Sequence, residues 1–104
     1  MELKLTDENF QKEIDNAKKP VLVDFFAQWC GPCQVLGPIL EEISKENDNF
    51  ILAKVDVDQA PQASQRFKVE KIPTVVLFKD KQPISGFVGM STKEDIKNWI
   101  NKLL

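Results

Sequence analysis

Two spacings of apolar residues alternate along this chain, and together they predict its secondary structure. Apolar residues at every third or fourth position indicate helices, whereas short continuous apolar runs indicate strands. Helices are predicted between Thr6 and Lys18, from near Cys30 to about Asn47, over residues 61–67, and from Ser91 to the end of the chain. Strands are predicted over residues 21–27, 51–57, 74–78 and 84–88, with a short edge strand over residues 2–5.

The order of these elements indicates the fold class. The run over residues 21–27 is apolar on both faces apart from Asp24, which is typical of a central strand covered on both sides. Only five residues separate the strands at 74–78 and 84–88, and a link this short requires an antiparallel hairpin. Strands that alternate with helices therefore predict an α/β fold, with a central mixed β-sheet flanked by helices on both faces.

Several residues mark the predicted ends and irregularities of the helices. Thr6 and Asp58 can cap the helices that follow them, because their side-chain oxygens can accept hydrogen bonds from free backbone N–H groups. Ser91 and Glu94 have the spacing of a capping box at the start of the last helix. Pro38 lies inside the second helical pattern and predicts a kink there.

Length and charge restrict the class of protein. With 104 residues the chain has the usual size of one domain, so we expect a single domain over residues 1–104. Its net charge of −2, with acidic and basic residues interspersed, favours neither nucleic acid nor anionic membranes as partners. No apolar run approaches the roughly 18 residues of a membrane span, and residues 1–7 do not resemble a signal peptide. We therefore expect a cytoplasmic monomer.

Candidate chemistry centres on the only two cysteines, Cys30 and Cys33. A purely structural disulfide is disfavoured because cross-links stabilise mainly by closing long loops. A zinc site needs about four ligands, and the chain has no histidine and no further cysteine. Reversible dithiol–disulfide exchange is the interpretation that a CxxC motif beside a βαβ pattern favours.

The position of the pair supports redox chemistry. The two cysteines follow a buried type of strand and begin a helix, where free N–H groups and the helix dipole stabilise an anion. We expect Cys30 to carry the favoured thiolate and Cys33, one turn further on, to be more shielded. Pro32 suits an early helical position and stiffens the ring, and Gly31 leaves room for the backbone of another protein.

Residues 23–33, ending in Trp-Cys-Gly-Pro-Cys, together with the later Ile72-Pro73-Thr74, resemble the thioredoxin family in sequence and spacing. The resemblance extends over essentially the whole chain. It implies the thioredoxin fold and the reduction of disulfides in other proteins, with Cys30 as nucleophile and Cys33 as resolving thiol. It also implies a separate thioredoxin reductase that restores the dithiol with electrons from a nicotinamide or ferredoxin source. No bound cofactor is required.

Asp24 and Lys54 are the candidate proton-handling residues. On the residues alone, Asp24 faces solvent or accepts local hydrogen bonds, or it is a buried carboxyl group with a raised pKa. The family resemblance implies the second alternative, in which Asp24 exchanges a proton with Cys33. Lys54 interrupts an apolar strand and either extends to water or pairs with Asp24, as the resemblance implies.

Candidate substrate-binding residues surround the cysteine pair. An Ile72–Pro73 bond is rarely cis on general grounds, but the resemblance implies a cis proline opposite the cysteines, with the Ile72 backbone free to pair with a substrate. Trp29 is either a core aromatic or, as we favour, part of the rim. The full set of substrate-binding candidates is Trp29, Gly31, Pro32, Ile72, Pro73, Gly89 and Met90.

The chain departs from the family pattern at four positions. Gln34 occurs where a lysine or arginine is common in the family, so the thiolate loses electrostatic support. The other departures are Phe26 for a larger aromatic residue, Met90 for a small residue and Lys81 for a turn glycine. None of the four removes the dithiol chemistry.

Two alternative functions keep the same fold. One is a binding or scaffold module whose dithiol is incidental, which predicts no dithiol-dependent reductase activity. The other is a dedicated oxidant or isomerase, which the Gly31-Pro32 spacer disfavours.

Overall fold

The computed structural model describes residues 2–104, which form five strands and four helices. The strands are β1 (Glu2–Leu5), β2 (Val21–Phe26), β3 (Ile51–Asp56), β4 (Thr74–Lys79) and β5 (Gln82–Val88). The helices are α1 (Phe10–Asn16), α2 (Gly31–Glu46), α3 (Pro61–Arg66) and α4 (Lys93–Leu103). No helix within the described part of the chain is both long and apolar enough to cross a membrane.

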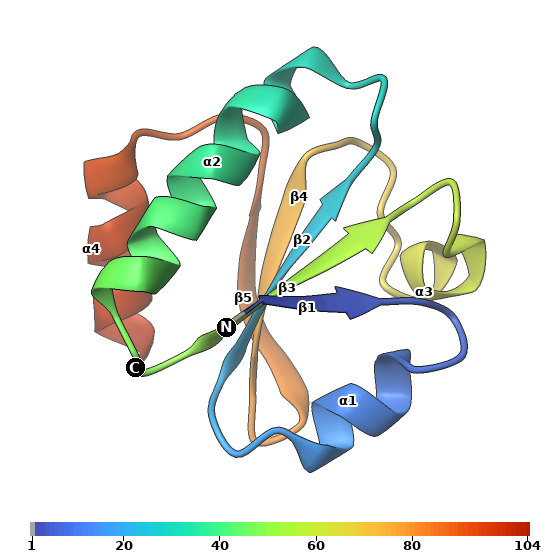
Figure 1. Ribbon diagram of the computed structural model, residues 1–104, viewed down its shortest axis with the longest axis horizontal. Coiled ribbons are helices and arrows are strands. Elements are labelled where there is room, and N and C mark those ends of the chain that lie inside the picture. Colours follow the sequence, from blue (N-terminus) through green and yellow to red (C-terminus); the bar gives the residue numbers. More distant parts are fainter. Residues whose placement is uncertain (1) are drawn as a thin grey trace.

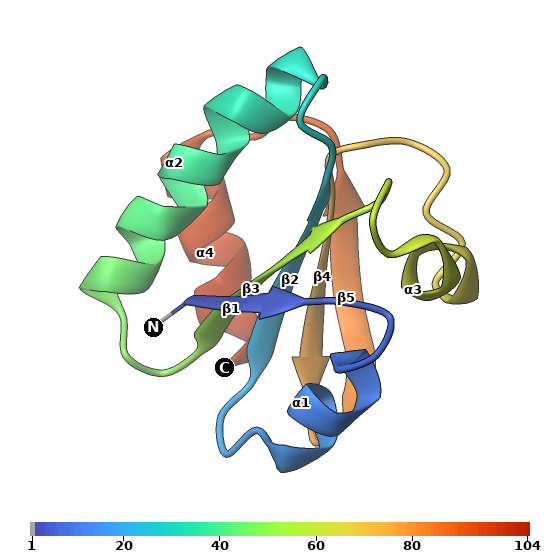
Figure 2. The same cartoon turned by 45° about the vertical axis from the view of Figure 1, so that its right-hand side comes forward.

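One sheet joins all five strands in the order β1-β3-β2-β4-β5. Strand β2 pairs with β3 in parallel and with β4 antiparallel, and β4 pairs antiparallel with β5. Helices α2 and α4 cover one face of the sheet and α1 and α3 the other (Figures 1 and 2). The predicted α/β fold with a central mixed sheet, the arrangement of the thioredoxin fold, is confirmed.

A separate hydrophobic core lies on each face of the sheet. On the α1 and α3 side, the rings of Phe10, Phe25, Phe67 and Phe78 pack together with centroid separations of 5.2 to 6.5 Å. On the α2 and α4 side the buried residues are mainly aliphatic: Leu22, Leu36, Leu40, Ile43, Leu52, Val75, Leu77, Ile96 and Ile100. Because neighbouring strand residues point to opposite faces, β2 is buried on both sides, as its apolar run predicts.

The predicted helix caps are wrong in detail. Helix α1 begins at Phe10, with Asn9 as its N-cap, while Thr6 and Asn9 exchange hydrogen bonds in the preceding turn. At α4 the cap is Thr92, whose hydroxyl accepts a hydrogen bond from Asp95 N, one residue beyond the predicted pair of Ser91 and Glu94. Neighbouring Ser and Thr side chains have similar capping ability, so local sequence does not determine which one caps.

Helix α3 takes its cap from a distant part of the chain. Asp58 makes no cap there; instead the Asp7 carboxylate accepts hydrogen bonds from Gln62 N at 3.2 Å and Ala63 N at 2.9 Å. Asp7 lies in the turn after β1, so only tertiary folding brings it to α3. Residue spacing along the chain gives no signal for a cap from so distant a residue.

The β4–β5 hairpin is tighter than predicted. Only Asp80 and Lys81 connect the strands, both with positive φ (52° and 71°), and β5 begins at Gln82 rather than Ile84. The pairing shifts register between Leu77 and Phe78, where a β-bulge accommodates the extra residue. Pro83 lies inside the edge strand β5, where a missing N–H is tolerated. The kink at Pro38, inside α2, stays a prediction.

Replacing Asp7 with alanine should destabilise the fold. The change leaves two N–H groups at the start of α3 without their carboxylate acceptor, at a cost of about 1 to 2 kcal/mol. Urea unfolding should show this loss, whereas Glu8→Ala, in the same turn and exposed, should unfold like the parent protein. Equal stabilities of the two variants would show that the Asp7 cap contributes nothing.

Candidate functional site

The cysteine pair lies where β2 leads into α2, at one end of the sheet (Figure 1). Cys30 is the N-cap of α2: its backbone is extended, and its Sγ accepts a hydrogen bond from Cys33 N at 3.2 Å. Pro32 lies in the first turn of α2, where its missing N–H has no cost. The first turn of the helix therefore directs a backbone donor at the first sulfur.

Cys30 and Cys33 form a disulfide, with their Cα atoms 5.3 Å apart. Each cysteine is only 5% exposed, so the expectation that Cys33 is the more shielded of the two is not met in this oxidised form. The disulfide packs against Ala27 and against the partly buried side chains of Phe26, Val57 and Ile72. The pair is thus held in an apolar surround at the surface end of the sheet.

A second backbone segment lies against the disulfide. The Ile72–Pro73 peptide bond is cis, and the Ile72 carbonyl oxygen lies 3.9 Å from Cys30 Sγ. Pro73 O accepts a hydrogen bond from Gly89 N at 2.8 Å, and Gly89 has a φ of 87° that favours glycine. The Ile72 N–H makes no hydrogen bond within residues 2–104. The structure therefore brings Ile72, Pro73 and Gly89 together beside Cys30.

Exposed side chains form the rim of the site. Trp29 is 72% exposed, so it is not a core aromatic, and its indole N–H donates to Asp58 Oδ2 at 2.7 Å. Met90 is 48% exposed, and Gly31 and Pro32 are exposed as well. Asp58 is a residue of the site that sequence reasoning assigned to a helix cap. Nothing in the local sequence indicates its contact with Trp29, which is 29 residues away.

Asp24 is buried beneath α2. Alternate residues of a strand point to the same face of the sheet. Leu22, two residues before Asp24 on β2, belongs to the core on the α2 side, so the Asp24 side chain also points toward α2. The residue is 1% exposed, and its Oδ1 has no hydrogen-bond partner among residues 2–104. Burial raises the pKa of the Asp24 carboxyl group from 3.8 to about 6, although the Lys54 ammonium group partly opposes the rise. The solvent-facing alternative for Asp24 is therefore excluded.

Lys54 lies beside Asp24 in the parallel β2–β3 pairing. Its Nζ is 3.9 Å from Asp24 Oδ2 and 3.3 Å from Glu41 Oε1, and it lies 5.8 Å from the centre of the Phe26 ring. The predicted approach of Lys54 to Asp24 is thus present, but Lys54 is shared with a second carboxylate. Sequence reasoning missed Glu41, whose only signal is its place on the same helical face as Cys33, two turns further on.

Gln34 has a clear structural contact. Its amide Nε2 donates a hydrogen bond to the Gln28 carbonyl oxygen at 3.0 Å. This bond ties the first turn of α2 to the loop before Cys30. Gln34 therefore contributes a positioning contact where a cationic residue is common, but no charge.

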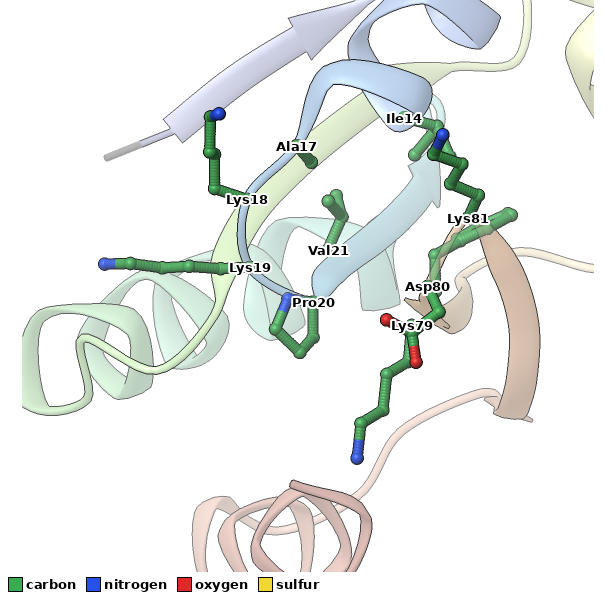
Figure 3. A pocket seen from close by; sticks show the side chains of 10 residues that line it. Ile14, Ala17, Lys18, Lys19, Pro20, Val21, Lys79, Asp80 and Lys81 are labelled. Carbon is green, nitrogen blue, oxygen red and sulfur yellow. The ribbon is translucent and has the colours of Figure 1, made fainter.

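Surface cavities occur away from the cysteine pair. Within residues 2–104, cavities of 170 to 480 Å³ lie on other parts of the surface, and neither cysteine lines them. Figure 3 shows one of these cavities, of 180 Å³, near the β4–β5 hairpin. The long side chains of Lys18, Lys19 and Lys79 point outward in different directions, so their ammonium groups do not meet at one point. The disulfide itself is largely buried, and the exposed residues beside it form the surface that another polypeptide can contact: Trp29, Gly31 and Pro32.

Comparison with known proteins identifies the family. The thioredoxin family model matches residues 1–102. Thioredoxin of Mycobacterium tuberculosis is 47% identical over 92 residues, which cover 88% of this chain and 79% of that protein. Thioredoxin of Alicyclobacillus acidocaldarius is 44% identical over 94 residues, covering 89% of each chain. Thioredoxin of Buchnera aphidicola is 40% identical over 101 residues, covering 96% of this chain and 94% of its own.

These matches agree with what the geometry allows. An α/β fold carries two cysteines at disulfide distance at the start of a helix, with a cis proline beside the first of them. As a dithiol, this pair can donate two electrons to a disulfide of another protein, and as a disulfide it can accept two electrons from another dithiol. The chain therefore belongs to the thioredoxin family and is a thiol–disulfide oxidoreductase that reduces protein disulfides.

Proposed function

We propose that Cys30 is the attacking nucleophile of this reductase. The observation that carries the proposal is the hydrogen bond from Cys33 N to Cys30 Sγ at the N-terminus of α2. In the dithiol form, the same N–H group and the helix dipole favour a thiolate on Cys30. The Cys30 thiolate attacks a substrate disulfide, and one substrate sulfur leaves as a thiolate while the other remains bonded to Cys30.

Cys33 resolves this mixed disulfide. Its thiol must lose a proton before its sulfur can attack Cys30 Sγ, and we assign Asp24 as the acceptor of that proton, directly or through a water molecule. The attack forms the Cys30–Cys33 disulfide and releases the second substrate thiol. Burial of Asp24 beneath α2 supports this role, because a pKa of about 6 leaves the carboxylate available near neutral pH. Lys54 stabilises the ionised form of Asp24.

An extended substrate segment docks across the end of the sheet. The free Ile72 N–H, next to the cis Pro73, supports backbone pairing of the β-augmentation type. The exposed Trp29 and Met90 supply apolar contact area around it. The proposed docking residues are Trp29, Gly31, Pro32, Ile72, Pro73, Gly89 and Met90.

Membership of the family implies disulfide-containing proteins as substrates and a reductase as partner. We further infer that this is a thioredoxin reductase and that the chain acts as a single-domain monomer in the cytoplasm. In this proposal it needs no bound cofactor and binds neither nucleic acid nor membrane, in keeping with its net charge of −2.

Serine replacement of each cysteine tests the order of attack. With Cys33→Ser, the mixed disulfide on Cys30 cannot be resolved, so covalent complexes with substrate proteins should accumulate on non-reducing gels. With Cys30→Ser, none should form. Both variants should lose dithiol-dependent insulin reduction. Adducts that form on Cys33 in place of Cys30 would reverse the assignment. Absence of insulin reduction in the parent protein as well as in Cys30→Ser would point to a binding module with an incidental dithiol.

Asp24→Asn tests the proton transfer. The variant should slow disulfide exchange by about a hundredfold near pH 7, where the native carboxylate is largely ionised and an ordinary thiol is still protonated. At higher pH the difference should shrink, because Cys33 then ionises without help. Asp15→Asn, an exposed aspartate on α1, serves as the control. An unchanged pH–rate profile would remove Asp24 from the mechanism.

The same substitution should also change the stability of the oxidised protein with pH. The folded state raises the pKa of Asp24 from 3.8 to about 6, so it binds more protons than the unfolded chain across this window. The free energy of unfolding therefore falls as pH rises from 4 to 7, by about 2 kcal/mol from this group. Urea unfolding of Asp24→Asn should lack that loss and show a variant more stable than the parent at pH 7. A parallel pH dependence in both proteins would contradict the raised pKa.

A further inference from the structure

Lys54 is shared unequally between two carboxylates. Its Nζ is 3.3 Å from Glu41 Oε1 and 3.9 Å from Asp24 Oδ2, so the ammonium group lies closer to the residue at the surface. The Glu41 side chain is 41% exposed and that of Asp24 only 2%. Asp24 Oδ1 meanwhile has no hydrogen-bond partner in the described part of the chain. Lys54 therefore stabilises the ionised form of Asp24 less than it would if its ammonium group lay closer to that carboxylate.

The Lys54 ammonium group packs against one face of α2. Cys33, Gly37 and Glu41 follow one another at intervals of four residues, which places them along the same side of the helix. A Cβ atom at Gly37 would lie 3.0 Å from Lys54 Nζ, so the ammonium group lies against the helix at this level. The same face of α2 therefore carries Cys33, then Gly37, whose missing side chain leaves room for the lysine, and then Glu41, whose carboxylate pairs with Lys54.

The charged groups near Asp24 come from three elements. Lys54 on β3 favours its ionised form, whereas Glu2 on β1 and Glu41 on α2 disfavour it. On the β4 side its neighbour is Val75, which carries no charge. In the reduced protein the Cys33 thiol on α2 is a further titratable group. Among these groups Glu41 is the one that contacts Lys54 and also acts on Asp24.

We propose that Glu41 is a positioning residue, which holds the Lys54 ammonium group toward the surface and so sets how strongly Lys54 supports the Asp24 carboxylate. This inference rests on the proposed role of Asp24 as proton acceptor. Its consequence is that the pH range of the resolving step is set by a partly exposed residue two helical turns from Cys33. Removal of Glu41 removes one anion and releases Lys54 toward Asp24, and both effects lower the pKa of Asp24.

Glu41→Gln provides the direct test, with Glu42→Gln as the matched control. Glu42 is the next residue of α2, but it pairs with Lys93 on α4 rather than with Lys54. The readout is the NMR titration of the Asp24 carboxyl carbon in the oxidised and the reduced protein. Glu41→Gln should lower its midpoint by about 0.4 of a pH unit or more, the size expected for coupled neighbours. Glu42→Gln should leave the midpoint in place.

A double variant separates positioning from simple charge repulsion. In a Lys54→Gln background the lysine is absent, so Glu41→Gln should have clearly less effect on the Asp24 midpoint than it has in the parent protein. The inference is overturned if Glu41→Gln leaves the midpoint unchanged. It is equally overturned if the shift is as large without Lys54, because Glu41 would then act only through its own charge.

The pH–rate profile of disulfide exchange distinguishes this inference from the proposed function. If the Asp24 midpoint and the rate profile move together in Glu41→Gln, both stand. If the midpoint moves and the rate profile does not, Glu41 still positions Lys54 and it is the proton transfer by Asp24 that fails. If the midpoint stays fixed while Asp24→Asn alters the rate profile, the inference fails and the proposed function stands.

Discussion

Burial of β2 at the centre of the sheet is the constraint on which the site depends. This strand has apolar partners on both faces, and it pairs in parallel with β3 and antiparallel with β4. Because β4 runs the opposite way, its first residues lie at the same edge of the sheet as the last residues of β2. The chain therefore brings Pro73 to the cysteine pair at the start of α2, across about 40 residues of sequence.

The same burial raises the pKa of Asp24. Placing Asp24 in the central strand removes its carboxyl group from water, and the charged form becomes costly. The Lys54 ammonium group, 3.9 Å from Asp24 and 3.3 Å from Glu41, offsets this cost only in part, so the pKa of the Asp24 carboxyl group is raised to about 6. A proton acceptor for a thiol needs this intermediate state, because a stronger acid would be a poorer base.

The disulfide is largely buried, and exposed side chains lie around it, including Trp29 and Met90. In the proposed function, specificity comes from this surround, through backbone pairing at Ile72 and apolar contact with Trp29 and Met90. The hydrogen bond from the Trp29 indole N–H to Asp58 fixes the position of the Trp29 side chain. The Gln34 side chain links the loop before Cys30 to the first turn of α2. These contacts fix parts of the rim, and the one made by Gln34 adds no charge.

The amino-acid sequence by itself determined the order of helices and strands, the fold class and the reactive pair. Those features depend on local spacing: apolar runs for strands, helical periodicity, and two cysteines three residues apart. The family resemblance then pointed to Asp24, Lys54 and Pro73. Only the tertiary structure decided which distant groups meet, including the cap of α3 by Asp7, the bond between Trp29 and Asp58, and the place of Glu41 beside Lys54. The physical reason is that hydrogen bonds and charge interactions act over a few ångströms in space, whereas spacing along the chain records only neighbours within one element.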